Sequence, residues 1–135
     1  ELVHRNNKNS ELTVYGYTPM MVSVQCVQKT MDHCNHACVQ YVLKDRYQKE
    51  FRGVCSCEFC YNTIYNTLPT SLLKEKEKAE KLGVKAYRLS FTIETQQETE
   101  KIVRAFVDVY LRGQKPDGQM QTEETTKGHF QRGVE

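Results

Sequence analysis

The sequence lacks the long apolar run that a membrane-spanning protein needs. No stretch of its 135 residues approaches the ~20 consecutive apolar residues of a membrane span. Its first five residues are not followed by the apolar segment of an export signal. We therefore expect a cytoplasmic protein with no membrane partner.

The sequence also lacks a strong charge of either sign. The formal net charge is +2, with 27% charged and 39% hydrophobic residues, which is ordinary for a soluble protein. Charge alone neither supports nor excludes an RNA partner. A chain of this length has room for one domain with one core.

An initiator methionine is absent, and the chain opens inside what looks like an ongoing element. We therefore expect it to be a piece of a longer protein, with the rest of its own chain upstream of Glu1 as a partner. Two hydrolase motifs are also missing, His-Glu-x-x-His and Gly-x-Ser-x-Gly. Their absence weighs against peptidase chemistry.

Cysteine, in contrast, is abundant and concentrated. All six cysteines fall between Cys26 and Cys60. A disulfide framework would be expected to tie distant parts of the chain together, so this distribution favours metal or cluster ligation, while disulfides and unligated thiols stay open. The two-residue gap between Cys57 and Cys60 allows one metal centre to take both thiolates from a single turn.

The positions of the other cysteines in the predicted elements narrow the choice of the remaining ligands. Cys26 ends a predicted strand, where open α/β sheets place functional groups, and Cys34 is the favoured fourth ligand. Cys38 and Cys55 remain alternatives. Zinc ribbons normally show two such two-residue gaps and this chain shows one, so the interpretation as a zinc site is weaker. An iron–sulfur cluster suits four thiolates equally well.

The first predicted region, residues 12–66, is rich in cysteine and in strands. Residues 12–24 predict a strand whose second part, 20–24, is buried. Residues 39–43 and 50–54 flank a polar connector and predict a β-hairpin that returns the chain to Cys57. The spacing of Tyr61, Ile64 and Tyr65 predicts a short helical turn.

The second predicted region, residues 70–113, alternates between helix and strand. An apolar stripe over residues 71–82 predicts a helix capped by Gly83, and residues 84–91 predict a strand. A capping box of Thr95 and Glu98 begins a helix that Gly113 ends. Such alternation indicates α/β architecture with parallel strands. The last region, residues 114–135, is a polar tail that either returns to the fold or stays mobile.

Four segments together resemble the C-terminal part of peptidase family U32. They are residues 14–26, residues 57–69 with the block Cys-Tyr-Asn-x-Ile-Tyr-Asn, residues 87–92, and residues 127–134. The resemblance covers most of the chain and implies a bacterial protein. It also implies a partial (β/α) barrel-like fold, with a cysteine-bearing loop and a β-hairpin insertion. It further implies a 4Fe–4S cluster held by Cys26, Cys34, Cys57 and Cys60.

The family is named for a collagenase-like peptidase activity, but other relatives resemble oxygen-independent hydroxylases of RNA or of ubiquinone precursors. We expect part of an iron–sulfur-dependent hydroxylase that acts on tRNA or rRNA, and we expect the fragment alone to be inactive. The alternatives are the peptidase for which the family is named and a zinc-bound structural or binding module.

A substrate-binding group is predicted from Arg88, His129 and Arg132. Strand alternation points Arg88 to the face opposite Tyr87 and Leu89. There its guanidinium either pairs with a carboxylate or binds an anionic substrate group in two-pronged fashion. Folding of the tail over the strand ends would add His129 and Arg132.

Overall fold

The computed structural model describes residues 9–31, 34–116 and 124–127. The chain divides into two compact units. The helix unit comprises Glu1–Gly16 and Leu68–Glu135, and the cysteine unit comprises Tyr17–Thr67.

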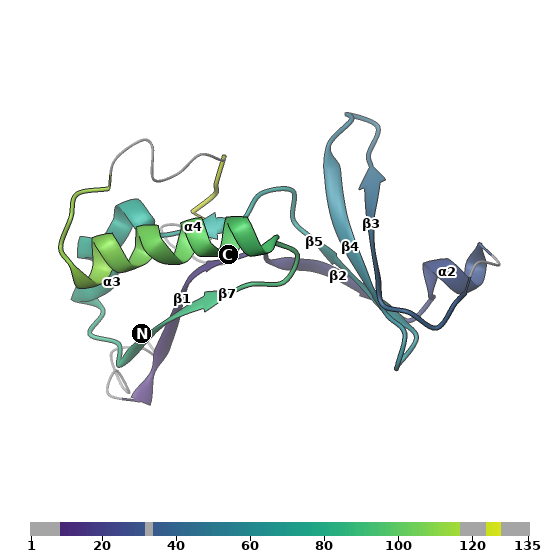
Figure 1. Ribbon diagram of the computed structural model, residues 1–135, viewed down its shortest axis with the longest axis horizontal. Helices are drawn as coiled ribbons and strands as arrows, with labels where there is room; N and C mark the ends of the chain where they lie inside the picture. The colour runs from purple at the N-terminus through teal and green to yellow at the C-terminus, as the bar shows by residue number, and fades with distance from the viewer. Residues whose placement is uncertain (1–8, 32–33, 117–123, 128–135) are drawn as a thin grey trace, which may run out of the picture. The chain divides into compact units, whose positions relative to one another are not determined.

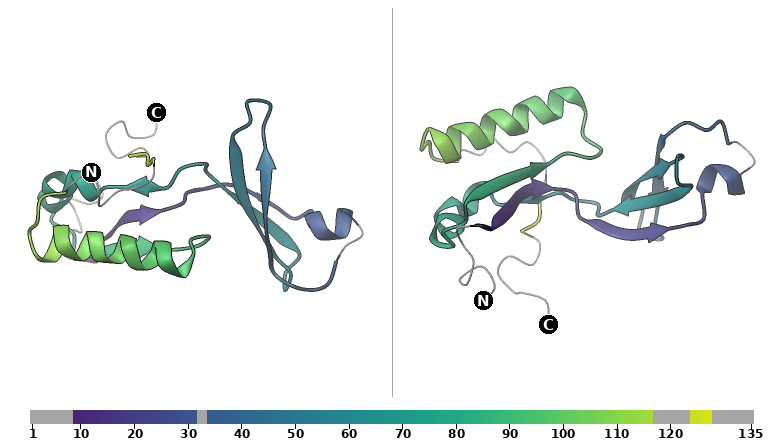
Figure 2. Two further views of the ribbon diagram at one scale, coloured as in Figure 1. Left: turned by 45° about the horizontal axis from the view of Figure 1, so that its top comes forward. Right: turned by 90° about the horizontal axis from the view of Figure 1, so that it is seen from below.

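The described part of the helix unit contains a small mixed sheet, with strands in the order β6 (Thr70–Ser71), β1 (Glu11–Gly16) and β7 (Ala86–Ser90). Strand β1 pairs in parallel with β7 and antiparallel with β6. Helix α4 (Gln96–Phe106) lies over one face of β1 and β7 (Figures 1 and 2). The predicted parallel pairing of strands is confirmed for β1 and β7.

Local signals set the helix boundaries in this unit. The capping box of Thr95 and Glu98 is present at the start of α4, and the chain then continues into the π-helical turn η3 (Val107–Leu111). Gly83 and Gly113 have φ angles of 63° and 70°, as expected at left-handed helix caps. The helix predicted over residues 71–82 is shorter than expected, because it begins as the 3-10 turn η2 (Leu73–Glu75) and only then becomes α3 (Lys76–Lys81).

The core of the helix unit packs α4 and η3 against β1 and the start of η2. Seven buried side chains form it: Val14, Tyr15, Leu72, Leu73, Ala105, Phe106 and Val109. The Tyr110 hydroxyl donates a hydrogen bond of 3.0 Å to the Leu72 carbonyl, which ties η3 to the segment before η2. The apolar stripes predicted from the sequence are therefore core.

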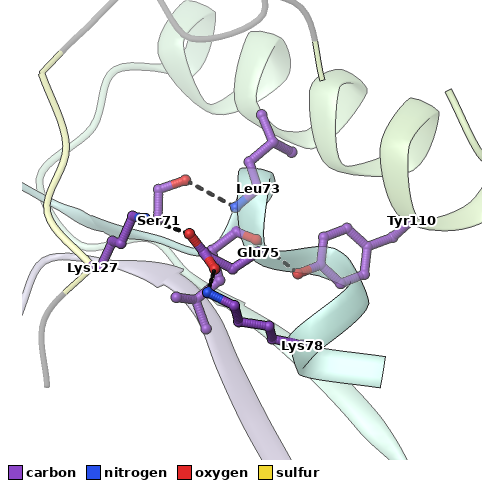
Figure 3. Close-up of polar contacts among 7 residues, drawn as sticks. Ser71, Leu73, Glu75, Lys78, Tyr110 and Lys127 are labelled. Atoms are coloured by element: carbon purple, nitrogen blue, oxygen red, sulfur yellow. Dashed lines mark hydrogen bonds and ion pairs between the residues drawn. The ribbon is translucent and has the colours of Figure 1, made fainter. Parts of the chain in front are cut away.

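Residues 124–127 return to the edge of this sheet. Ser71 donates its backbone N–H to the Thr126 carbonyl at 2.8 Å, and Thr126 donates its own to the Pro69 carbonyl at 2.9 Å. Lys127 then forms an ion pair with the buried carboxylate of Glu75, which Lys78 also contacts at 2.7 Å (Figure 3). This part of the predicted tail is thus anchored by backbone pairing and by charge.

The cysteine unit is an antiparallel sheet in the order β2 (Pro19–Ser23), β5 (Tyr61–Tyr65), β4 (Glu50–Ser56) and β3 (Val39–Lys44) (Figure 1). The predicted hairpin of β3 and β4 is confirmed, with register running from Val39 opposite Cys55 to Lys44 opposite Glu50. A single helical turn, α2 (Val27–Thr30), follows β2.

Two predictions for this unit are wrong. Residues 61–65 form strand β5 and not a helical turn, because β2 and β4 both pair with this segment. The segment after Pro19 is extended but not buried, since Met20, Met21 and Val22 are all more than half exposed. It also lies in a different sheet from β1.

Among the described residues the architecture is mixed α/β with two sheets, and neither sheet closes into a barrel. The barrel-like fold implied by the resemblance is therefore not confirmed. The same residues include no helix with the length and apolar character to cross a membrane.

Candidate metal centre

Three cysteine side chains meet inside the cysteine unit. Cys26, Cys55 and Cys57 are all buried, and Cys55 is completely inaccessible to solvent. The sulfur atoms of Cys26 and Cys55 are 3.3 Å apart, at hydrogen-bonding distance. Residues that are 29 positions apart in sequence thus form one thiol cluster.

Strand alternation and a tight turn explain how β4 contributes to this cluster. Side chains two residues apart point to the same face of a strand, so Cys55 shares a face with Gly53, and Cys57 is the first residue after the end of β4. The turn of residues 57–60 joins β4 to β5, with Ser56 opposite Tyr61 and Cys60 in a left-handed conformation at φ 52°. The predicted pair Cys57 and Cys60 therefore lies at the tip of a hairpin.

The side chain of Asn62 holds Cys26 in place. Asn62 is fully buried in β5, opposite Cys55. Its amide nitrogen donates to the Gln25 carbonyl, and its amide oxygen accepts from the Val27 N–H at 3.5 Å. One amide group thus binds the backbone on both sides of Cys26 and fixes that residue beside Cys55.

Cys26 is also the N-cap residue of α2, and this placement affects its thiol. The pKa of Cys26 is lowered, first by the nearby backbone N–H of Lys29 and then by the Cys55 thiol. Burial and, after it, the adjacent Cys26 sulfur together raise the pKa of Cys55 to about 12. Burial likewise raises the pKa of Cys57, as does the neighbouring Cys34.

These pKa shifts indicate which of the three buried thiols favours its anionic form. Only one of the three buried sulfur atoms sits where its anionic form is favoured. A bound metal cation would lower the pKa of the thiols that it coordinates, because their thiolate forms bind the metal. The protein alone thus holds Cys55 and Cys57 as neutral thiols, and a soft metal is the partner that their sulfur atoms suit.

The other three cysteines are exposed. Cys34 reaches the Cys57 thiol, and Cys60 donates to the Cys57 carbonyl across 3.7 Å. Cys60 and Cys26 also line one shallow hollow together with Lys29. The four predicted ligands therefore lie in one neighbourhood of the cysteine unit, two buried and two at its surface.

The donor set fits a thiolate-bound group in chemistry, although the side chains are not arrayed around a common centre. No three His, Cys, Asp or Glu side chains within residues 9–31, 34–116 and 124–127 are arranged as metal ligands. None of the six cysteines is in a disulfide. Ligation by the predicted set would require the surface thiols of Cys34 and Cys60 to turn toward Cys26 and Cys57.

A buried hydroxyl group beside the thiol cluster has no hydrogen-bond partner among the residues that the structure describes. Tyr41 of β3 packs against the three buried cysteines, and its hydroxyl oxygen is inaccessible and makes no hydrogen bond. Burial raises the pKa of Tyr41, with further contributions from Cys55 and Cys26, so the hydroxyl keeps its proton. A buried donor without an acceptor is costly and calls for an explanation.

The predicted substrate residues lie elsewhere. Arg88 is in β7 of the helix unit, where its Nε is 2.5 Å from a carboxylate oxygen of Glu11, and both side chains are largely exposed. This pairing agrees with the carboxylate alternative considered from the sequence. His129 and Arg132 fall outside the described residues.

Sequence reasoning missed Asn62 and Tyr41 and ranked Cys55 as a substitute. The signal for Cys55 was its spacing of two residues from Cys57, next to a predicted strand. The signal for Asn62 was a polar residue that follows the Cys57-x-x-Cys60 pair within a run of strand-forming side chains. No family model matches the chain, and no curated protein or solved structure matches it.

Proposed function

We propose that this chain is the cluster-bearing part of an oxygen-independent hydroxylase that acts on RNA. Cys26, Cys34, Cys57 and Cys60 hold a 4Fe–4S cluster in this proposal. The observation that carries it is the gathering of these four thiols, two of them buried, around the hairpin turn that joins β4 to β5. The hydroxylase activity and the RNA substrate rest on the resemblance to peptidase family U32.

The chain's own residues would prepare this site. Asn62 orients Cys26, the hairpin turn presents Cys57 and Cys60, and Cys34 adjoins Cys57. A bound cluster would supply one-electron transfer. Thiolates engaged in this way are not free nucleophiles, which is why we favour the hydroxylase over a cysteine-dependent peptidase.

Anaerobic purification tests the cofactor. We expect a brown protein with visible absorbance and about four iron and four acid-labile sulfide per chain after reconstitution with Fe²⁺ and sulfide. A colourless chain that retains zinc and takes up no iron would refute the cluster.

The substrate needs a separate test in cells. Nucleosides from RNA of a strain that lacks the gene for this protein would be compared by mass spectrometry with those of the parent strain. We expect one hydroxylated nucleoside to disappear and to return with the wild-type gene but not with a Cys57→Ser gene. An unchanged nucleoside profile would remove RNA as the substrate.

One observation favours a second candidate, a zinc-bound module. Tetrahedral zinc with bonds of about 2.3 Å places its sulfur ligands about 3.8 Å apart. The 3.3 Å between Cys26 and Cys55 is close to that spacing. In this alternative Cys55 is a ligand, so Cys55→Ser would abolish zinc binding, whereas the cluster proposal leaves Cys55 unligated.

A further inference from the structure

Tyr41 packs against the cluster formed by Cys26, Cys55 and Cys57. It lies in β3 directly opposite Gly53 of β4, and Cys55 is the next residue of β4 on the same face. A side chain on β3 at this position therefore covers Gly53 and borders the thiol cluster.

The absence of a side chain at position 53 is what allows this placement. A Cβ atom at Gly53 would be 2.3 Å from Cζ of the Tyr41 ring and 2.7 Å from its hydroxyl oxygen. The aromatic ring therefore rests directly on the Gly53 backbone. Any other residue at position 53 would displace the Tyr41 ring from the thiol cluster.

The hydroxyl group of Tyr41 lacks an acceptor among the protein atoms described. Its oxygen is buried, so water does not reach it, and the cysteine thiols against which the ring packs do not accept its proton. Buried hydroxyl groups in folded proteins almost always have a partner. Since the described residues supply no acceptor, an atom of a bound group is a candidate for this partner.

We propose that the Tyr41 hydroxyl donates a hydrogen bond to a sulfur atom of the bound metal centre, and that this bond tunes the electronic properties of the centre. The inference rests on the proposed thiolate-bound centre. The acceptor is an anionic sulfur, either a cysteine thiolate or an inorganic sulfide of the cluster. Hydrogen bonds to such sulfurs change cluster reduction potentials, and they stabilise the reduced, more negative state. Tyr41 is thus a positioning and tuning residue, not a ligand.

The test compares Tyr41→Phe with wild type in the full chain reconstituted with Fe²⁺ and sulfide. Phenylalanine keeps the ring and removes only the hydroxyl group, so iron and sulfide contents should be unchanged. We expect the midpoint potential, followed by electron paramagnetic resonance in a redox titration, to shift to a more negative value. Tyr47→Phe is the matched control, because Tyr47 is 68% exposed at the tip of the same hairpin.

A second variant tests the same contact from the other strand. Gly53→Ala should push the Tyr41 ring aside and reproduce the negative shift even though the hydroxyl is still present. Circular dichroism would check that each variant is folded. Equal potentials for wild type, Tyr41→Phe and Gly53→Ala would overturn the inference.

A parallel arm with Co²⁺ separates this inference from the choice of cofactor. If wild type assembles no cluster but binds Co²⁺ through thiolates, the iron–sulfur proposal fails. Tyr41 is then judged by whether Tyr41→Phe shifts the sulfur-to-cobalt charge-transfer band. An unshifted band overturns the inference, and a chain that binds neither probe overturns both proposals.

Discussion

At the scale of single residues, the six cysteines differ in what surrounds them. Cys55 is completely buried in the interior of β4, whereas Cys60 is exposed on the hairpin turn. Burial alone would assign Cys55 to the metal centre and exclude Cys60. The proposed ligand set makes the opposite assignment, so the two residues provide its sharpest test.

We predict that Cys57→Ser and Cys60→Ser reduce bound iron to background, because each removes one of four thiolates. Cys55→Ser should retain iron, since serine fills nearly the same volume and Cys55 is not a ligand in this set. Iron and zinc per chain would be measured by elemental analysis. Cys38→Ser is the control for the loss of an exposed thiol. Loss on replacing Cys55, with retention on replacing Cys60, would instead favour the zinc-bound module.

Asn62 acts through Cys26 and not on the metal directly. Asn62→Leu keeps the approximate volume but leaves the Gln25 carbonyl and the Val27 N–H without their partner. We predict that the free energy of unfolding falls by about 2 kcal/mol, since each buried unpaired group costs about 1–3 kcal/mol. Iron uptake should fall as well. Urea unfolding and iron content are the measurements.

The control for this variant is Asn66→Ala. In the described part of the chain, the Asn66 side chain accepts from the neighbouring Thr67 N–H alone, so its loss should have a smaller effect on stability and none on iron uptake. Equal effects of the two variants on iron uptake would show that Asn62 does not position Cys26.

Arg88 is predicted from the sequence to bind an anionic group of the substrate, and in the structure it pairs with Glu11. If Arg88 has this role, Arg88→Lys in the proposed hydroxylase should keep the cluster but lower RNA modification, because lysine has no two-pronged donor geometry. Glu11→Gln is the matched variant, since it removes the carboxylate that now pairs with Arg88 and should not lower modification. Product would be measured by nucleoside mass spectrometry. Full activity of Arg88→Lys, or loss of its cluster, would show that Arg88 is structural.

At the scale of elements, Glu75 at the end of η2 joins the segment of residues 124–127 to the first helical turns of the helix unit (Figure 3). Hydrogen bonds from Lys127 and then from Lys78 lower the pKa of Glu75 to about 2. A carboxyl whose pKa is depressed in the folded state stabilises the fold above its ordinary pKa of 4.5. That contribution is lost as the pH falls from about 4.5 toward 2.

We therefore predict that Glu75→Gln lowers the free energy of unfolding by about 1 kcal/mol at pH 7. The value is modest because both lysines are half exposed to solvent. Below pH 4.5 the difference from wild type should shrink as wild type loses the same ion pairs. Chemical denaturation at several pH values measures this, and Glu77→Gln, an exposed neighbour, is the control. A difference that stays constant down to pH 2 would contradict the assignment.

Elements with local signals could be predicted from the sequence, and elements fixed by distant partners could not. The capping box of Thr95 and Glu98 and the glycine after α3 involve neighbours in the chain, so α4 and Gly83 were predicted well. Strand β5 was predicted wrongly because the spacing of Tyr61, Ile64 and Tyr65 also fits a helix. Only pairing with β2 and β4 decides between them.

The same distinction applies to the candidate site. The Cys57-x-x-Cys60 pair is local and was readable in the sequence. The contact between Cys26 and Cys55 and the placement of Tyr41 on Gly53 depend on sheet register. Register is set by pairing between strands, which a single sequence does not display.

At the scale of the whole molecule, the interior of each of the two units is stabilised by a different kind of interaction. The core of the helix unit is built from aliphatic and aromatic side chains. The buried cluster described in the cysteine unit consists of three cysteines with Tyr41 packed against them, while several apolar side chains of β2 are exposed. Little apolar burial supports the cysteine unit, so metal binding should supply much of its stability.

We predict that removing the metal destabilises the cysteine unit selectively. Treatment of the reconstituted full chain with a strong chelator should raise amide hydrogen exchange in β4 and β5 by about tenfold or more, because their opening no longer has to release the metal. Exchange in α4 should stay unchanged, since its amides belong to the apolar core. Exchange would be followed by mass spectrometry of peptides from each unit.

The control is Cys57→Ser, which should exchange rapidly in β4 and β5 without chelator and show no further response to it. The two proposed centres differ in a second readout of the same samples: exposure to air should open the cysteine unit if it holds an oxygen-sensitive cluster and leave it closed if it holds zinc. Equal acceleration of exchange in α4 and β5 would mean that the two units unfold together. No acceleration in either unit would mean that the thiol cluster is stable as a metal-free core.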